Sequence, residues 1–282
     1  MTKLLDHDLV RGAAARIGVH PLEDLAPSRV ACHYALQLPS SVGFTFVPAR
    51  ADYRHTVARW NRARAEIEGP RAPDGFTACV DPVAGAIVLR DGEQVLDRRP
   101  LAGCTLDEAY AWLGAAIGRR RAEPGCVLTR PAHDLPEHPI AHGEPFPEVS
   151  LGATSELAAW LELADAALGS AADRLHDASV PCIWPHHFDT ATLVDLGEGK
   201  SIGIGFSPGD TSYPEPYFYV NLWPYPDPGT PRRELAGGGR WHTDGWTGAV
   251  LRGDALLRAE DRVHALDAFL VTAFDASRDL LR

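Results

Sequence analysis

Apolar and polar residues alternate most clearly in the last third of the chain. In segments 201–207 and 216–223 every second residue is apolar. The apolar set is Ile202, Ile204, Phe206, Phe218, Val220 and Leu222. A β-strand points successive side chains to opposite faces of its sheet. The alternation therefore predicts two strands that share one buried face, with further strands at about 187–196 and within 239–251.

Helical patterns flank these strands. Apolar residues form a stripe over 154–177 and another over 260–281, which predicts two amphipathic helices. A third helix is expected at 106–121, because Thr105 is a typical N-cap and acidic residues precede a run of arginines. The alanine-rich segment 4–18 predicts a fourth.

The first half of the chain carries its own strand signals. Segments 29–38 and 42–47 are expected to be strands, and 76–100 is expected to be a meander with Asp-Pro and Asp-Gly turns. Each half then reads as helix, strands, helix. This order predicts an α+β fold with two helix-flanked, mainly antiparallel sheet units, and it suggests an internal duplication.

Residues 122–150 interrupt this order. The stretch is rich in proline, contains His133, His138 and His142, and shows no periodicity, which is typical of a linker or a long loop. The expected organisation is an N-terminal α+β unit at 1–121, this linker at 122–150, and a C-terminal α+β unit at 151–282 that holds the candidate site.

Composition narrows the classes of partner. The formal net charge is −11 over 282 residues without a basic block, which argues against nucleic-acid binding. No window is apolar enough for a membrane span, and the N-terminus lacks the features of a signal peptide. The five cysteines are scattered and never form a C-x-x-C pair. We therefore expect a cytoplasmic protein with a small-molecule partner, no nucleic-acid partner and no membrane partner.

The segment CIWPHHFDTATL, residues 182–193, contains the first candidate chemistry. On a strand, His187 and Asp189 share one face and present a nitrogen and a carboxylate together. A second His-x-Asp pair, His242 and Asp244, follows later. The two pairs are candidate ligands for a divalent metal ion, and the first is a candidate acid–base pair. The alternative is that these histidines are structural and only brace a sheet.

A second candidate feature is the face opposite the apolar stripe. On 201–207 this face carries only serine and glycine, whereas on 216–223 it carries Tyr217, Tyr219 and Asn221. If the two strands pair, the tyrosines can cover the glycines. We expect an aromatic-walled cleft at which a small molecule binds. The expected substrate-binding residues are Tyr217, Tyr219, Asn221, Asp210, Glu215 and Trp184.

Three stretches carry a family resemblance. They are IWPHHFDTATL, IGIGFSPGDTSYPEPYFYVNLWPYP and ALDAFLVTAFDA, which together span about 183–276. Over these residues the chain resembles DUF5996, a bacterial family of unknown function. The resemblance implies no catalytic residues.

The expected function follows from the two candidate features. The leading interpretation is a small-molecule enzyme with a His/Asp aromatic cleft, for which metal-dependent hydrolysis or oxidation fits His and Asp ligation. The alternative is a non-catalytic protein that binds a ligand or a partner in the same aromatic cleft.

Overall fold

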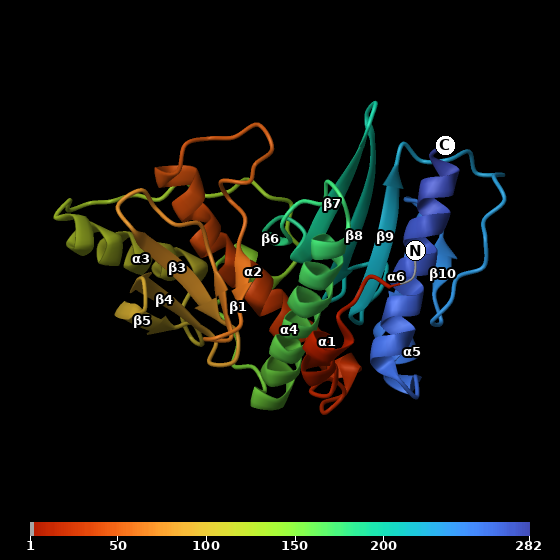
Figure 1. Ribbon diagram of the computed structural model, residues 1–282. Coiled ribbons are helices and arrows are strands. Elements are labelled where there is room, and N and C mark those ends of the chain that lie inside the picture. Colours follow the sequence, from red (N-terminus) through yellow and green to blue (C-terminus); the bar gives the residue numbers. More distant parts are fainter. Residues whose placement is uncertain (1–2) are drawn as a thin grey trace. The chain divides into compact units, whose positions relative to one another are not determined.

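The computed structural model describes residues 3–282 and divides the chain into two compact units (Figure 1). We call Leu25–Ala158 with Cys182–Phe188 the N-terminal unit. Met1–Asp24, Ala159–Pro181 and Asp189–Arg282 form the C-terminal unit. The two sheets have five and six strands, all paired antiparallel where the register is defined. The predicted α+β class with two antiparallel sheet units is thus confirmed.

The units differ in extent from the predicted ranges of 1–121 and 151–282. The start of the chain groups with the C-terminal unit because one carboxylate on the last helix anchors it. The backbone N–H groups of Leu4 and Leu5 donate to Oδ1 of Asp267 at 2.8 and 2.9 Å. Contacts across more than 260 residues leave no local signal in the sequence.

The N-terminal unit contains a five-stranded sheet in sequential order. Its strands are β1 (Arg59–Asn61), β2 (Glu66–Glu68), β3 (Phe76–Asp81), β4 (Ala86–Asp91) and β5 (Gln94–Pro100). The meander predicted at 76–100 is confirmed. Helix α3 (Leu106–Arg121) has Thr105 as its N-cap, as the sequence predicted, and the structure adds a full capping box with Glu108.

The strands predicted at 29–38 and 42–47 are wrong. Both segments lie in one helix, α2 (Leu25–Phe46), which continues through Pro39. All of its residues from Cys32 to Gly43 are buried. A helix buried on nearly all sides has no polar stripe, so its sequence lacks the period by which helices are recognised.

Residues 122–150 form a long and mostly irregular segment. Their only regular element is a short 3₁₀ helix, η2 (Pro139–His142). The predicted absence of an α-helix or strand is therefore confirmed for this stretch. It belongs to the N-terminal unit, where Phe146 exchanges backbone hydrogen bonds with Gly103 and Cys104 at 2.9 Å.

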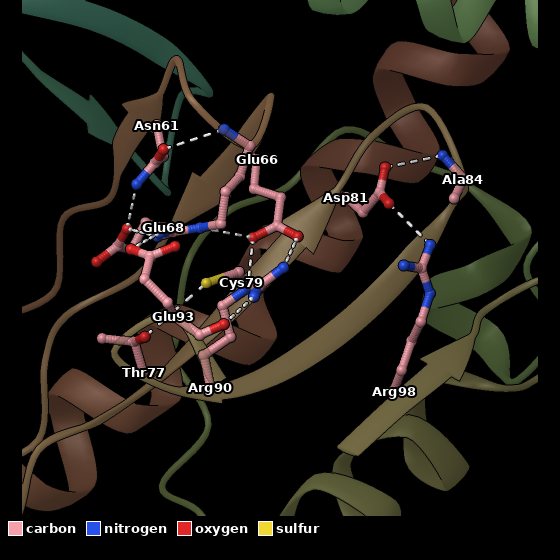
Figure 2. A network of polar contacts seen from close by, with 11 residues as sticks. Asn61, Glu66, Glu68, Thr77, Cys79, Asp81, Ala84, Arg90, Glu93 and Arg98 are labelled. Atoms are coloured by element: carbon pink, nitrogen blue, oxygen red, sulfur yellow. Dashed lines mark hydrogen bonds and ion pairs between the residues drawn. The ribbon is translucent and has the colours of Figure 1, made fainter. Parts of the chain in front are cut away.

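A buried ion pair joins two strands of this unit (Figure 2). Arg90 on β4 donates two hydrogen bonds to Glu66 on β2, at 2.8 and 2.6 Å, and both residues are buried. Arg98 donates to Asp81 at 2.8 Å in a more exposed position (Figure 2). Because a bidentate pair fixes both distance and orientation, the buried contact links β2 and β4 across β3.

The six-stranded sheet has the order β10-β11-β9-β8-β7-β6. Its strands are β6 (Cys182–Trp184), β7 (Asp189–Gly197), β8 (Lys200–Ser207), β9 (Tyr217–Trp223), β10 (Arg240–His242) and β11 (Gly248–Arg252). The helices that accompany it are α1 (His7–Ala14), η1 (Leu22–Asp24), α4 (Leu151–Arg174), α5 (Gly253–Arg258) and α6 (Arg262–Leu280). The strands and helices predicted in this half are confirmed to within a few residues.

One face of this sheet forms the core of the C-terminal unit. All six predicted apolar residues of β8 and β9 are buried. Trp160 of α4 stacks on Phe206 with ring centroids 6.0 Å apart, and α6 contacts β8, β9 and β11. Helices therefore cover this face, which leaves the opposite face for the candidate chemistry. Among residues 3–282, no helix combines the length and apolar content needed to cross a membrane.

Candidate functional site

The polar face of β8 and β9 carries the predicted tyrosines, and we call it the tyrosine face. It is defined by Gly203, Gly205, Tyr217, Tyr219 and Asn221. Gly205 pairs with Tyr219, and a Cβ at Gly205 would lie 2.2 Å from Cζ of that tyrosine. Gly203 stands in the same relation to Asn221, whose Oδ1 would be 2.2 Å away. The prediction that tyrosines cover the glycines is confirmed at Gly205, whereas Asn221 covers Gly203.

The glycine lets one tyrosine reach across a strand. Ala191 on β7, Gly205 on β8 and Tyr219 on β9 lie in one row of the register, and Asp189 shares the face of Ala191. The Tyr219 hydroxyl passes over Gly205 and donates a hydrogen bond to Oδ2 of Asp189. Both side chains are half-buried. A phenol and a carboxylate are thus held together at a partly solvent-accessible position.

A second phenol–carboxylate pair lies beside the first. The Tyr217 hydroxyl donates to Oδ2 of Asp210 at 2.5 Å, and its ring centroid is 6.1 Å from that of Tyr219. Oδ1 of Asp210 accepts the backbone N–H groups of Ser212 and Tyr213 at 2.7 and 2.9 Å. Burial, together with the Asp210 charge, raises the pKa of Tyr217 far above its usual range. Tyr217 therefore remains a hydrogen-bond donor at neutral pH.

Asp210 and Glu215 have structural partners in this arrangement. Asp210 orders the loop that follows β8, as its two backbone bonds indicate. Glu215 accepts a hydrogen bond from Nε of Arg252 at 2.6 Å and is half-buried. Their expected role as direct substrate contacts stays a prediction. The structure adds that they position neighbouring side chains.

His242 lies on β10 and already uses both ring nitrogens. Its Nε2 is 2.7 Å from the carbonyl oxygen of Asp244, which can only accept, so Nε2 carries the proton. Its Nδ1 lies 2.8 Å from the Tyr213 hydroxyl, so both ring nitrogens have hydrogen-bond partners. Asp244 contacts the histidine through its backbone, not its carboxylate. This pair is therefore not presented as two ligands for a metal ion.

The first His-x-Asp pair does not lie on one strand, so that expectation is wrong. Strand β6 ends at Trp184, residues 185–188 form a turn, and β7 begins at Asp189. The backbone N–H of Phe188 donates to the carbonyl of Trp184 at 2.8 Å, and Phe188 has a φ of 54°. A turn of this kind ends the strand alternation on which the expectation depended. His187 is exposed in it, and His186 is half-buried.

The turn is held by polar groups that sequence reasoning missed. Nε2 of His33 and Nε2 of Gln37, both on α2, donate to the Pro185 carbonyl at 3.0 and 2.7 Å. Oε1 of Gln37 also accepts from Nδ1 of His133 at 2.8 Å. No local pattern connects these positions, because α2 and the proline-rich stretch meet the turn only in the folded unit.

Several imidazoles lie close together in the N-terminal unit. Burial lowers the pKa of His33 to about 4. Burial, and then the charges of His187 and His133, lowers the pKa of His186 to about 4. The rings of His186 and His187 have centroids 4.2 Å apart, and Trp184 contacts His186 edge-on. Trp184 therefore packs on the histidine turn within this unit.

The metal prediction finds no geometric support in the described part of the chain. Within residues 3–282 no group of three or more histidine, cysteine, aspartate or glutamate side chains is arranged to hold a metal ion. His242 and Asp244 are used as described above, and the carboxylate of Asp189 accepts from a phenol. The chemistry of these residues is better described by hydrogen bonding than by ligation.

Comparison with known proteins finds a family match in the C-terminal part of the chain. Residues 191–282 match the model of a family of unknown function, DUF5996. The predicted resemblance is thereby confirmed over this segment. No curated protein and no solved structure matches the chain. The DUF5996 segment contains β8 to β11, so all residues of the tyrosine face lie inside it, while Asp189 precedes it by two positions.

A separate apolar cavity of about 190 Å³ lies in the N-terminal unit. It is lined mainly by α2, by the β3–β4 connection and by residues near Phe146. Cys32 lines it, and burial raises the pKa of that thiol to about 12. The thiol is protonated at neutral pH and is not an activated nucleophile. The sequence contains no signal for this cavity.

Proposed function

We propose that the protein is a small-molecule enzyme whose substrate binds on the tyrosine face. The observation that carries the proposal is the hydrogen bond from Tyr219 to Asp189 across Gly205. A glycine is required there, because a Cβ at Gly205 would lie 2.2 Å from Cζ of Tyr219. A carboxylate within reach of a phenol, both half-buried, is a common basis for acid–base catalysis.

The chemistry that this pair supports is proton transfer. In the proposed step a substrate group gives its proton to the Tyr219 oxygen while the phenolic proton moves to Asp189. The reverse transfer returns a proton to the product. Tyr217 and Asn221 flank the pair and supply an aromatic face and an amide for orienting a substrate. His187, exposed two positions before Asp189, stays a prediction as a further acid–base group.

The setting of the reaction follows from the thiols and the charge. All five cysteines are free, which supports a reducing compartment, and we propose the cytoplasm. The formal charge of −11 supports a small molecule, in preference to a nucleic acid, as the partner. The alternative function is a binding protein, which the internal hydrogen bonds of Asp210 and His242 favour.

The test is conversion of a small molecule. The purified protein is incubated with a mixture of small-molecule metabolites, and mass spectrometry follows the compounds consumed and formed. We expect at least one conversion that Asp189→Asn slows about 100-fold or more. Asp195→Asn is the matched control, because Asp195 is an exposed aspartate on the same strand.

The outcomes separate the two functions. Loss of conversion in Asp189→Asn and in Tyr219→Phe, with conversion kept in the Asp195 variant, supports the enzyme. Binding without conversion by the unmodified protein supports the binding protein. Equal conversion by all variants would refute a role for the Asp189–Tyr219 pair.

A further inference from the structure

Five aromatic rings on the tyrosine face contact one another in a closed circuit. The order is Tyr213, Tyr217, Tyr219, Trp246, His242 and back to Tyr213, with ring centroids 5.0, 6.1, 6.3, 4.4 and 5.5 Å apart. From this circuit we infer that the face takes an organic cation, a methylated or quaternary ammonium group. The inference rests on the proposed function, because it names the substrate class of the same site.

The circuit is assembled from two stretches of the chain, 213–219 and 242–246. Tyr213 comes from the loop that Asp210 orders, the two other tyrosines come from β9, and His242 ends β10. Trp246 lies in the connection to β11, where a Cβ at Gly248 would be 2.4 Å from its ring. Only folding brings these rings together, and glycines make room for two of them. Gly205 makes room for Tyr219 and Gly248 makes room for Trp246, so the arrangement of the rings requires a glycine at each of these two positions.

The dimensions suit a cation. A cation gains energy when it lies within about 6 Å of the centroid of an aromatic ring. Neighbouring centroids in the circuit are 4.4 to 6.3 Å apart, so one cation placed over the circuit has several rings within that range. Tyr217 is buried, whereas the four other rings are half-buried and retain solvent-accessible surface.

The charges around the circuit have the required sign. Asp189 and Asp210 each accept a hydrogen bond from one of its phenols, and that donation increases the electron density of the ring. Two cations, Arg240 and Arg252, lie near Tyr213, and Arg252 is paired with Glu215 and Asp254. The carboxylates thus add a net negative charge to an aromatic surface.

The same hydrogen bonds favour an alkylated cation. A primary ammonium group has three N–H donors and gains most from free acceptors. Here Tyr219 and Tyr217 already donate to the two carboxylates. A methylated or quaternary ammonium needs few or no acceptors and is attracted by ring faces. Recognition of such groups is a known use of aromatic clusters.

The test compares choline with 3,3-dimethylbutan-1-ol, a neutral molecule of the same shape. Calorimetric titration of the full-length protein measures both. We expect choline to bind at least tenfold more tightly than the neutral alcohol. Trp246→Ala should weaken choline binding at least tenfold, and Trp246→Phe should weaken it less. Trp223→Ala is the matched control, because Trp223 is an exposed tryptophan of the same unit outside the circuit.

Each outcome decides the inference. Far-UV circular dichroism and a thermal melt establish that the variants are folded, and Trp246→Phe retains an aromatic ring if the alanine variant is unstable. Equal binding of choline and the neutral alcohol, or no binding of choline, would overturn the inference. Choline binding without conversion of any metabolite would leave the cation site intact and refute the enzyme. Conversion of an uncharged substrate would support the enzyme and refute the cation site.

Discussion

At the scale of single residues, the candidate site depends on one missing side chain. Gly205 has no Cβ, and the ring of Tyr219 occupies the space that a Cβ would fill. That space lets a residue of β9 reach Asp189 on β7 across the intervening strand. The sequence predicted tyrosines over glycines from strand alternation. It also predicted that Asp189 lies near Tyr217 or Tyr219, and Asp189 accepts a hydrogen bond from Tyr219.

Gly205→Ala tests this arrangement. The added Cβ would collide with the Tyr219 ring at 2.2 Å, so the ring must leave its position over β8 and lose its bond to Asp189. We expect a loss of about 1–3 kcal/mol in unfolding free energy and a loss of metabolite conversion. Urea denaturation and the conversion assay measure the two effects. Gly229→Ala is the control, because a Cβ there meets no atom within 4 Å. Unchanged stability and conversion in the Gly205 variant would contradict the arrangement.

His33 gives a prediction about pH. Its pKa is lowered from 6.5 to about 4 by burial, so the unfolded chain binds a proton at a higher pH than the folded one. The contribution of neutral His33 to the free energy of unfolding is therefore fully present above pH 6.5. It is lost as the pH falls toward 4, by about 3 kcal/mol. The unfolding free energy of His33→Gln should fall less steeply over this range. Identical pH slopes for the two proteins would show that His33 is not held neutral by burial.

At the scale of elements, the sequence predicted those helices and strands whose own residues show a buried face or a cap. Strands β7 to β9 and helix α6 keep one face in the core, so their sequence period shows the face. Helix α3 carries its own cap in Thr105 and Glu108. Helix α2 is buried on nearly all sides and has no readable period, and the turn at 185–188 depends on α2 and His133. The site was predictable where strands carry it and not where distant segments meet.

The buried ion pair between β2 and β4 gives a prediction at this scale. Arg90→Met removes the two hydrogen bonds that Arg90 donates to the buried Glu66 carboxylate (Figure 2) and leaves it with Arg64, whose Nε is 3.4 Å from Oε2 of Glu66. We expect a loss of about 3–5 kcal/mol in unfolding free energy, and recovery of much of it in Arg90→Met with Glu66→Leu. Arg98→Met is the control and should cost less than about 1 kcal/mol, because its partner Asp81 forms a more exposed pair. Urea denaturation measures all three, and equal losses for the two single variants would contradict the ranking.

At the scale of the whole molecule, the two units are built from interleaved parts of the chain. The start of the chain joins the last helix through Asp267, and the segment Cys182–Phe188 returns to the N-terminal unit. Ile183 fixes that return, since it exchanges backbone hydrogen bonds with Ala58 at 3.0 and 2.7 Å. Sequence boundaries drawn from composition cannot show such exchanges, because they arise from contacts of high sequence separation.

Charge gives a prediction for the whole molecule. The formal charge of −11 should repel a phosphate backbone, so a gel-shift assay with duplex DNA at low salt is expected to show no complex at micromolar protein. A salt-sensitive complex in that assay would refute the small-molecule assignment of the partner. A basic DNA-binding protein in the same gel is the positive control.

The most direct test of the central claim is hydrogen–deuterium exchange with the compound that the conversion assay identifies. The account predicts slower exchange in two segments that carry the aromatic circuit, 208–216 and 242–248, when that compound is present. Peptides from the β3–β4 connection of the N-terminal unit, next to the apolar cavity, should not change. Slower exchange only in the peptides from the β3–β4 connection, with no change in 208–216 or 242–248, would contradict the account.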